Sequence, residues 1–415
     1  MRNTRLLALG TIALTALAAC SDSTGPKGIG SAPRAALAAG GYHNCRITGT
    51  KTECWGYNGD GQLGDGTYNQ ATTPVTVSGG LTFVHVTTGY YHTCALTSAG
   101  KAYCWGYNGY SQLGDGTTND SNVPVAVGGG LTFTSLTTGD SHNCGLTSSG
   151  TAYCWGGNWS GQLGDNTNTD QSSPVPVSTT LKFAKITAIG SHTCALTTDG
   201  TAYCWGDNWR GKLGDGTNTE TEHDTPTAVV GGHAFTQIVG GYDHSCGLAK
   251  DGKTYCWGYN GEGELGIGTA DDNVHGTPAA VVGGQTFKVL SEGRFDQLCG
   301  LTSAGQAYCW GYNAYGQIGD GTTDNRATPV AIGGAIRFSA IAAGDSHTCG
   351  RATTGATYCW GSNGDGQIGD GTYVEQHSPV AVSAGAAALR ASASIVSGGT
   401  TSSRGTPGNA AHHVR

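Results

Sequence analysis

Short apolar stretches separated by turn residues dominate the hydrophobic pattern of this chain. In one 50-residue segment, Leu81–Thr88, His92–Thr97 and Ala102–Gly106 are rich in β-branched, aromatic and small residues, and Pro124–Val127 follows a polar loop. The turn Ser98–Gly100 separates the second of these stretches from the third. The segment contains no apolar stripe with the 3.6-residue period of a helix. The pattern therefore predicts four short antiparallel strands per segment.

The segment is repeated seven times, which determines the predicted fold. Its Cys-Trp-Gly sequence recurs at steps of 50, 50, 50, 52, 53 and 50 residues, beginning at Cys54, Cys104, Cys154, Cys204, Cys256, Cys309 and Cys359. A fixed period of this size is typical of propellers and solenoids. Four strands repeated radially around a channel predict an all-β, seven-bladed β-propeller over residues 35–383. Insertions near Glu220–Asp224 and Ala270–Gly276 are expected to lengthen the same loop in two blades.

Composition and charge narrow the class of partner. The chain has 72 glycines and only 12% charged residues, which suits short strands joined by tight turns. The formal net charge is −8, and residues 1–34 and 384–415 each carry +3, so the repeats carry −14. Because nucleic-acid binding needs clustered Lys and Arg, this acidic block argues against DNA or RNA as a partner.

The 15 cysteines divide into one single residue, Cys20, and one pair in each repeat. The members of a pair flank the hairpin turn symmetrically, so we expect them to lie opposite one another and to form a disulfide. Each bridge would contribute about 2–3 kcal/mol by the chain-entropy estimate. Zinc is the alternative, but the close Cys pairs of zinc sites are absent. The predicted bridges are Cys45–Cys54, Cys94–Cys104, Cys144–Cys154, Cys194–Cys204, Cys246–Cys256, Cys299–Cys309 and Cys349–Cys359.

The two ends of the chain differ from the repeats. Residues 1–20 have a basic start, an apolar run and small residues before Cys20, which is the pattern of a secretory signal. Leu17–Cys20 resembles the lipobox of bacterial lipoproteins and predicts lipidation of Cys20, although an ordinary cleavage site is the alternative. Ser21, which follows it, favours the outer membrane. We expect residues 21–34 to form a flexible tether and residues 384–415 a disordered tail.

The residues that recur in every blade are expected to be structural. A His before the first Cys recurs six times, and a catalytic His is needed only once, so we expect it to bond a backbone group between blades. The Trp after the second Cys is expected to pack between blades. Asp-Gly and Asn-Gly are turn sequences, and calcium at one blade is the alternative. The chain shows no serine-hydrolase elbow, His-Glu-x-x-His or phosphate loop, and we predict no cofactor and no metal.

The positions that vary between copies are candidates for binding. Two loops vary: the residues after Trp-Gly and the residues before the recurrent His, such as Tyr90–Tyr91 and 294–296. Tyr and Trp on rigid loops dominate binding hot spots, although some of them could simply cover the joints between blades. The predicted binding residues are Tyr57, Tyr107, Tyr110, Trp159, Trp209, Arg210, Tyr259, Tyr312 and Tyr315.

The repeats resemble the family named after the regulator of chromosome condensation. Val86–Thr93 and Ile341–Thr348 match its signature of an apolar residue, two small residues, Gly, two variable residues, His and Ser/Thr. The resemblance covers about 350 residues and implies a seven-bladed propeller. Nuclear members act as nucleotide-exchange factors and bind chromatin, which an exported acidic protein would not meet. Similar secreted bacterial propellers include β-lactamase inhibitors, which bind through aromatic loops.

The sequence as a whole predicts a monomeric, non-enzymatic binding module of the bacterial cell envelope, anchored in a membrane by a lipid or secreted. Its partner would be a protein or a polysaccharide. Two alternatives stay open: an enzyme that acts on polysaccharides in the central channel, and an exchange-type regulator. A His or acidic residue that occurs in one blade only and lines the channel would favour the enzyme.

Overall fold

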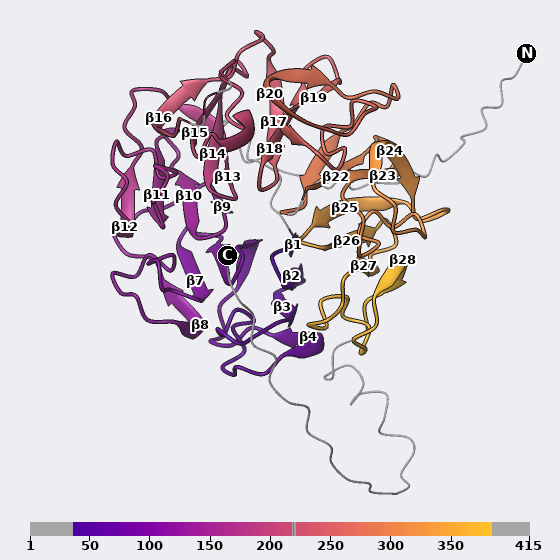
Figure 1. Cartoon of the computed structure of the whole chain (residues 1–415). Helices are drawn as coiled ribbons and strands as arrows, with labels where there is room; N and C mark the ends of the chain where they lie inside the picture. The colour runs from indigo at the N-terminus through magenta and orange to yellow at the C-terminus, as the bar shows by residue number, and fades with distance from the viewer. Residues whose placement is uncertain (1–35, 218, 220, 295, 384–415) are drawn as a thin grey trace, which may run out of the picture. The chain divides into compact units, whose positions relative to one another are not determined.

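Strands β1 to β28 form seven four-stranded sheets, and each sheet consists of four strands that follow one another in the chain (Figure 1). The computed structural model describes residues 36–217, 219, 221–294 and 296–383. The predicted signal sequence, Cys20, the tether and the tail lie outside the described residues. The described part confirms the predicted all-β fold of seven blades.

The strands have the following bounds. The first three sheets contain β1 Leu37–Ala39, β2 His43–Thr48, β3 Lys51–Gly56 and β4 Ala71–Thr76; β5 Phe83–Thr88, β6 His92–Thr97, β7 Ala102–Gly106 and β8 Ser121–Ala126; and β9 Ser135–Thr138, β10 His142–Leu146, β11 Ala152–Gly156 and β12 Gln171–Pro176. The next two contain β13 Phe183–Ile189, β14 His192–Thr197, β15 Ala202–Gly206 and β16 His223–Ala228; and β17 Phe235–Gly240, β18 His244–Ala249, β19 Thr254–Asn260 and β20 Asp271–Ala280. The last two contain β21 Val289–Glu292, β22 Gln297–Leu301, β23 Ala307–Gly311 and β24 Arg326–Ile332; and β25 Phe338–Ala343, β26 His347–Ala352, β27 Thr357–Gly361 and β28 Gln376–Ala381. A single 3-10 turn, η1, spans Trp209–Gly211.

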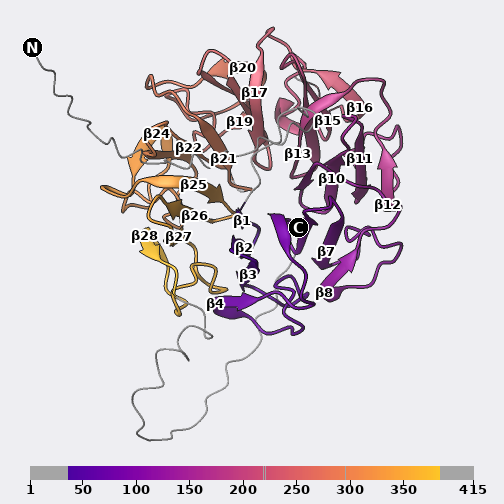
Figure 2. The same ribbon diagram turned by 180° about the vertical axis from the view of Figure 1, so that it is seen from behind.

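The first strand of each blade is the innermost and the fourth is the outermost (Figures 1 and 2). Thr87 of β5, Thr137 of β9 and Thr187 of β13 line one central cavity of about 410 Å³. We call the space between the first strands the central channel. Two of the strands predicted from the sequence, His92–Thr97 and Ala102–Gly106, are confirmed to the residue.

The other strand predictions were less accurate. The first strand of the second blade begins at Phe83 rather than Leu81, and the fourth spans Ser121–Ala126 rather than beginning at Pro124. The insertion at Ala270–Gly276 does not lengthen a loop, because most of it extends β20 to ten residues. A local pattern cannot show how far an outer strand continues, since its partner strand decides that.

Each central hairpin carries the predicted disulfide. In the second blade Cys94 lies directly opposite Cys104 in the register of β6 and β7. Gly100 makes the hairpin turn possible, because its φ of 77° lies in the left-handed region. The seven bridges join Cys45–Cys54, Cys94–Cys104, Cys144–Cys154, Cys194–Cys204, Cys246–Cys256, Cys299–Cys309 and Cys349–Cys359.

The hydrophobic core lies between blades rather than within them. Trp155 of the third blade is fully buried against Leu113 and the Cys94–Cys104 disulfide of the second blade, together with Phe133. The recurrent Trp thus packs between blades, as predicted. Its indole also donates a hydrogen bond of 2.9–3.1 Å to one carbonyl of the preceding blade, at Gln367, Gln62, Gln112, Gln162, Lys212, Glu264 or Gln317.

The recurrent His forms a second link, but the predicted partner was wrong. His92 Nε2 lies 2.9 Å from the side-chain oxygen Oδ1 of Asn143 in the next blade, not from a backbone group. Asn143 Nδ2 in turn donates to the carbonyl of Gln112 at 2.6 Å. Burial lowers the pKa of His92 to about 4, so the imidazole is neutral at physiological pH.

The seam between the seventh and first blades uses the same links. His347 Nε2 lies 2.9 Å from Asn44 Oδ1, and Asn44 Nδ2 donates to the carbonyl of Gln367 at 2.7 Å. The amide of Asp345 donates to the carbonyl of Gly40 at 3.1 Å. Within the described residues no strand from one end of the chain joins a blade of the other end. The amide of Gly371 also donates to the Thr72 carbonyl at 2.9 Å, so side chains and two backbone contacts close the ring. The described residues also contain no helix that is long and apolar enough to cross a membrane.

We predict that Asn44→Ala weakens ring closure. The substitution removes a buried amide that bonds both His347 and the Gln367 carbonyl, and a lost buried partner costs about 1–3 kcal/mol. Urea unfolding followed by tryptophan fluorescence should show a lower free energy of unfolding. Asn69→Ala is the matched control, because Asn69 is exposed and lies in a loop of the same blade. Equal loss in both variants would contradict this account of closure.

Candidate functional site

The two varied loops of every blade lie at the same edge of the sheet. Strands alternate in direction, so the loop after the first strand and the loop after the third strand emerge together. In the first blade these loops are residues 40–42 and 57–70. We call the surface formed by these loops the loop face.

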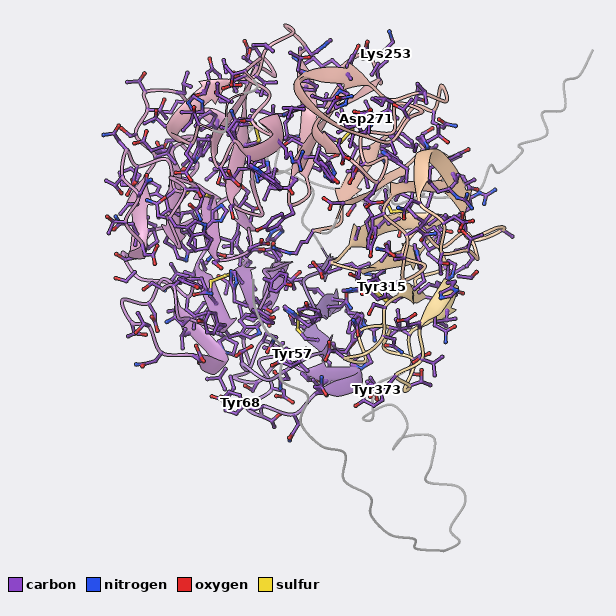
Figure 3. All side chains as sticks on the ribbon, in the orientation of Figure 1. Tyr57, Tyr68, Lys253, Asp271, Tyr315 and Tyr373 are labelled. Atoms are coloured by element: carbon purple, nitrogen blue, oxygen red, sulfur yellow. A yellow bond between two sulfur atoms is a disulfide. The ribbon has the colours of Figure 1, made fainter. Side chains whose placement is uncertain are left out.

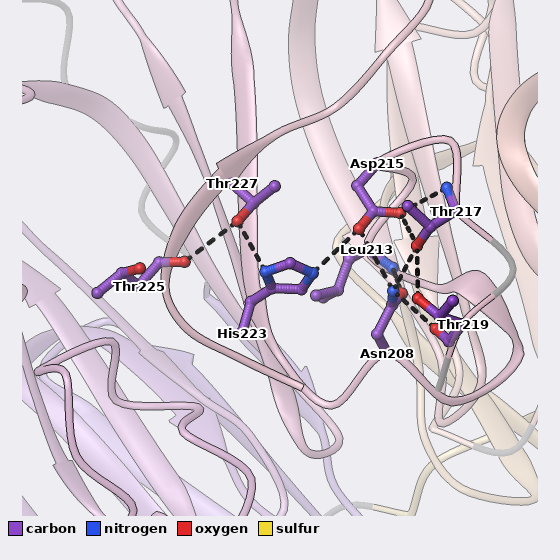
Figure 4. Close-up of polar contacts among 8 residues, drawn as sticks. All are labelled: Asn208, Leu213, Asp215, Thr217, Thr219, His223, Thr225 and Thr227. Carbon is purple, nitrogen blue, oxygen red and sulfur yellow. Dashed lines mark hydrogen bonds and ion pairs between the residues drawn. The ribbon is translucent and has the colours of Figure 1, made fainter. Parts of the chain in front are cut away.

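The longer loop is held rigidly by its own side chains. In the fourth blade Asn208 Oδ1 accepts a hydrogen bond from the Leu213 amide at 3.1 Å, and its Nδ2 donates to the Thr219 carbonyl at 3.3 Å (Figure 4). Asp215 Oδ1 accepts from the Thr217 amide at 2.9 Å. The Asp-Gly sequences are thus turn sequences. Among the described residues, His, Cys, Asp and Glu form no group of three that could hold a metal ion.

A run of aromatic rings crosses the first three blades on the loop face. Tyr42 lies 5.3 Å from Tyr90 between ring centroids, and their hydroxyls are 2.9 Å apart. Tyr107 contacts Tyr110 at 6.1 Å, and Tyr110 contacts Trp159 across a blade joint at 5.3 Å. We call this run the aromatic run; its members are Tyr42, Tyr57, Tyr90, Tyr91, Tyr107, Tyr110 and Trp159.

The other predicted binding residues form two smaller groups. The Arg210 guanidinium lies 4.6 Å from the Trp209 ring and 5.0 Å from the Tyr259 ring, so these three form one cation–π cluster. Tyr312 and Tyr315 contact each other at 6.4 Å in the sixth blade. Tyr110, Trp159, Trp209 and Tyr315 are each 38–44% exposed, whereas Tyr57, Tyr107, Tyr259 and Tyr312 are half-buried.

In four of the seven blades, an aromatic ring of the longer loop lies over a glycine two positions away in the sequence. A Cβ on Gly59 would lie 2.1 Å from the Tyr57 hydroxyl, and one on Gly157 would lie 2.4 Å from the Trp159 ring. One ring therefore covers one glycine, and either position can supply the ring. In the seventh blade the two positions hold Ser362 and Gly364, so neither supplies a ring, and nothing lies within 4 Å of a Cβ on Gly364.

A pocket of about 310 Å³, which we call the blade-7 pocket, lies beside Ser362, one of these two ring-free positions. Its lining residues come from the first, second, sixth and seventh blades. The lining residues are Gly41, Tyr42, Tyr90, Tyr312, Tyr315, Asp345, Ser346, Ser362 and Gln367. Figure 3 shows Tyr57 and Tyr315 nearer the middle of the ring than Tyr68 and Tyr373.

Asp345 is the acidic group of this pocket. It is only 4% exposed, and burial, followed by the charge of Asp140, raises its pKa to about 7. Its Oδ1 atom is buried and has no hydrogen-bond partner. Sequence reasoning noted the loop that contains Asp345 but did not select the residue. The sequence feature that could have identified it is the presence, in one repeat, of Asp345 and of the two positions without an aromatic ring, Ser362 and Gly364.

Arg294 reaches across the ring from the sixth blade. Its guanidinium forms an ion pair with Asp140 and donates to the carbonyl oxygens of Thr88 at 2.9 Å and Gly139 at 3.2 Å. Arg294 also lines a cavity of about 260 Å³, whose other lining residues include members of the first strands of the blades. The side chain therefore bridges the sixth blade to the second and third blades at one end of the central channel. This contact joins residues 206 positions apart and could not be inferred from the repeat.

The channel walls bear on the enzyme alternative. His85 occurs in one blade only and lines the channel, as that alternative requires. Its Nε2 lies 2.8 Å from the Leu136 carbonyl, and the other ionisable groups of the described channel lining are Lys185, Lys288 and Arg294. No carboxylate belongs to the described lining of these two cavities.

Five blades carry a buried Gln at the same position beneath the loop face, for example Gln112. The fourth and fifth blades carry Lys212 and Glu264 there instead. Lys212 is 1% exposed and pairs with Asp207 at 2.6 Å and with Asp243 at 3.1 Å. Glu264 is fully buried, its Oε1 atom has no partner, and its Oε2 accepts from the Glu262 amide at 3.0 Å. Burial, followed by the charge of Asp296, raises the pKa of Glu264 to about 8.

Comparisons with known proteins agree on one family. A family model described as the RCC1-like domain matches residues 79–403, and a model of the regulator of chromosome condensation (RCC1) repeat matches residues 54–96. Over 125 residues the chain is 29% identical to the ultraviolet-B receptor UVR8 of Arabidopsis thaliana, covering 30% of this chain and 28% of the receptor. Over 112 residues it is 38% identical to the human E3 ubiquitin-protein ligase HERC2, covering 26% and 2% respectively. The match thus spans less than a third of these curated relatives.

Solved structures show the same fold. The structure of Prp20p from Saccharomyces cerevisiae superposes with a TM-score of 0.72 at 21% identity, covering 80% of this chain and 86% of that chain. Human WBSCR16 superposes with a TM-score of 0.69 at 21% identity, covering 76% and 85%. At such identities the likeness is one of fold alone.

We predict that Glu264→Gln stabilises the protein at alkaline pH. The folded protein holds Glu264 protonated up to about pH 8, whereas the unfolded chain ionises it near 4.5, so the wild type loses stability as pH rises between these values. The variant avoids this loss, which is on the order of 2–4 kcal/mol at pH 8.5. Urea unfolding at pH 4.5 and pH 8.5 should show similar stability at the lower pH and a more stable variant at the higher.

Glu375→Gln is the control for this measurement, because it makes the same chemical change at an exposed position. The one ion pair of Glu375 in the described residues is with His377, at a distance of 3.9 Å. A Glu264→Gln variant whose stability follows the same pH course as the wild type would contradict the raised pKa.

Proposed function

Because this chain belongs to the family of regulator of chromosome condensation (RCC1) repeat proteins, we propose that it is a non-enzymatic binding module whose loop face receives a protein partner. The observation that carries the proposal is the aromatic run. Its rings are fixed by contacts with one another, yet Tyr110 and Trp159 stay more than two-fifths exposed.

Rigid aromatic residues favour protein binding for an energetic reason. A Tyr or Trp side chain that is already held in one position loses little conformational entropy when a partner covers it. Such residues, together with Arg, carry most of the binding energy in protein interfaces. The loop face supplies both kinds, in the aromatic run and in the cluster of Trp209, Arg210 and Tyr259.

Known relatives also support a protein partner. The structure of Prp20p is described together with its binding to Gsp1p and histones, and yeast RCC1 is described bound to Kap60. Gsp1p, histones and Kap60 are partners of the yeast protein. Seven disulfides disfavour the exchange-factor alternative, because that alternative requires a cytosolic protein with free thiols.

A polysaccharide ligand is the second candidate. Exposed Tyr and Trp rings can stack on sugar rings, and His85 in the channel is the one feature that favours catalysis on such a ligand.

We further propose that the protein is anchored in the bacterial cell envelope through acylated Cys20. Disulfides persist in oxidising compartments, and seven of them are typical of an exported protein. Two or more acyl chains hold a protein stably at a membrane, whereas one chain gives only marginal binding.

We predict that Trp159→Ala/Trp209→Ala abolishes partner capture. The full-length protein and this double variant are used as baits for envelope extract of the source bacterium, and bound proteins are compared by quantitative mass spectrometry. Loss of two hot-spot residues should lower recovery of a specific partner by about tenfold or more. Tyr68→Ala/Tyr373→Ala is the matched control, since these tyrosines are 55% and 56% exposed but lie outside the aromatic run. Recovery that is equal for all three baits would eliminate the loop face.

We predict that Cys20→Ser moves the protein from the membrane fraction to the soluble fraction. Metabolic labelling with a fatty-acid analogue should mark the wild type and leave the variant unlabelled. The other cysteines serve as an internal control, because all fourteen are held in disulfides. A soluble, unlabelled wild type would show that residues 17–20 are an ordinary cleavage site.

A further inference from the structure

The blade-7 pocket is an opening that the other blades fill. In the first, second and fifth blades a Tyr after Trp-Gly lies over a glycine two residues later. The seventh blade keeps the glycine, Gly364, but replaces the Tyr with Ser362. Ser362, which carries no ring, lines the pocket together with Tyr312 and Tyr315 of the sixth blade and Tyr42 and Tyr90 of the first and second blades.

The electrostatics of the pocket favour a positively charged ligand. Asp345 lines the pocket, and its buried Oδ1 atom has no hydrogen-bond partner. Burial, together with the charge of Asp345, raises the pKa of both Tyr42 and Tyr90. Asp140 and Asp296 add further negative charge near Asp345. The nearest cation, Arg294, is already paired with Asp140 and bonded to the carbonyl oxygens of Thr88, Thr138 and Gly139.

We propose that the blade-7 pocket binds the side-chain cation of a Lys or Arg residue of the partner protein, with Asp345 as its counter-ion and the tyrosine rings around it. The inference names the chemistry of one part of the loop face and rests on the function proposed above. Aromatic rings attract a cation through their negative π faces, and this attraction is stronger where water is excluded. A buried carboxylate needs a partner charge, which the ligand supplies.

Binding should depend on pH through Asp345. The groups that face this carboxyl are Asp140, Arg294 and Asp296 from loops of the third and sixth blades, Ser346 from its own loop, and Tyr42 and Tyr90 from the first and second blades. Because the pKa of Asp345 is about 7, the carboxyl is mostly protonated at pH 5.5 and mostly ionised at pH 8. A cation should therefore bind about 10- to 30-fold more tightly at pH 8.

The test uses the purified full-length protein and small probes in place of a partner. Nα-acetyl-lysine amide and Nα-acetyl-arginine amide are titrated at pH 8 and pH 5.5, and binding is followed by NMR. Nα-acetyl-norleucine amide has the same stem without the charge, and cellobiose represents a neutral sugar. We expect dissociation constants in the millimolar range for the two cations at pH 8, and at least about tenfold weaker binding of norleucine amide and of cellobiose.

Variants locate the binding. Asp345→Asn should weaken cation binding at pH 8 by about tenfold or more and remove its pH dependence. Ser362→Tyr should abolish binding without loss of stability, because it restores the ring that sibling blades carry over an equivalent glycine. Asp251→Asn is the matched control: it makes the same change in charge at an exposed hairpin turn that joins β18 to β19, at the opposite edge of the sheet.

The outcomes separate this inference from the proposed function. Absence of cation binding at pH 8, equal binding of lysine and norleucine amides, preference for cellobiose, or unchanged binding by Ser362→Tyr would each overturn the pocket assignment. If Asp345→Asn does not fold, Ser362→Tyr decides the question by itself. The bait experiment with Trp159→Ala/Trp209→Ala does not involve the pocket, so the loop face can stand when the pocket assignment fails.

Discussion

The ring depends on one carbonyl in each blade that accepts hydrogen bonds from the next blade. The carbonyl of Gln112, for example, accepts from both Trp155 and Asn143, and equivalent carbonyls serve all seven seams. Every blade is built from contiguous strands, so the ring is held closed by these side-chain links, by the apolar packing around each Trp and by backbone hydrogen bonds between neighbouring blades, such as Gly116 N to the Ser172 carbonyl at 2.8 Å. The seam between the fifth and sixth blades is the exception. Leu298 occupies the position where the partner of the recurrent His is Asn, Thr or Ser at other seams, and His244 Nε2 is buried without a hydrogen-bond partner.

The sequence predicted those parts of the fold that depend on neighbours in the chain. The period, the central hairpin and its disulfide all follow from residues within about ten positions of one another, such as Cys94, Gly100 and Cys104. It failed where the partner lies one repeat away. The bond of His92 to Asn143 joins residues 51 positions apart, and the extension of β20 depends on β19 in a blade with an insertion. A local sequence pattern contains no information on the partner of His92 or on the length of β20.

The candidate site was predicted by residue type but not by arrangement. Comparison of the seven copies selected Tyr110, Trp159 and Tyr315, which the structure places exposed at the loop edge of their blades. It noted the varied loops that contain Tyr42 and Tyr90 but did not select these residues, whose contact joins the rings of two blades. It also missed Asp345, because the pocket above it results from a side chain that is absent, at Ser362. The missing ring at Ser362 can be interpreted only when the surrounding residues of the other blades are known.

The departures from the repeat indicate where stability has been given up. Five blades carry Gln beneath the loop face, which is a neutral side chain that satisfies the loop amide above it, as in Tyr110 N to Gln112 Oε1 at 2.9 Å. Glu264 and Lys212 occupy the same position at the cost of burying charge or an unpaired oxygen, and Asp345 is a third buried ionisable group on the same edge. Burying such groups destabilises a fold unless a partner satisfies them. Five sibling blades serve the same loop amide with a Gln, which does not ionise, so stability does not explain Lys212 and Glu264. Of the three groups, Asp345 lines the blade-7 pocket beside rings that are already fixed in place, which is the arrangement that a positively charged partner would require.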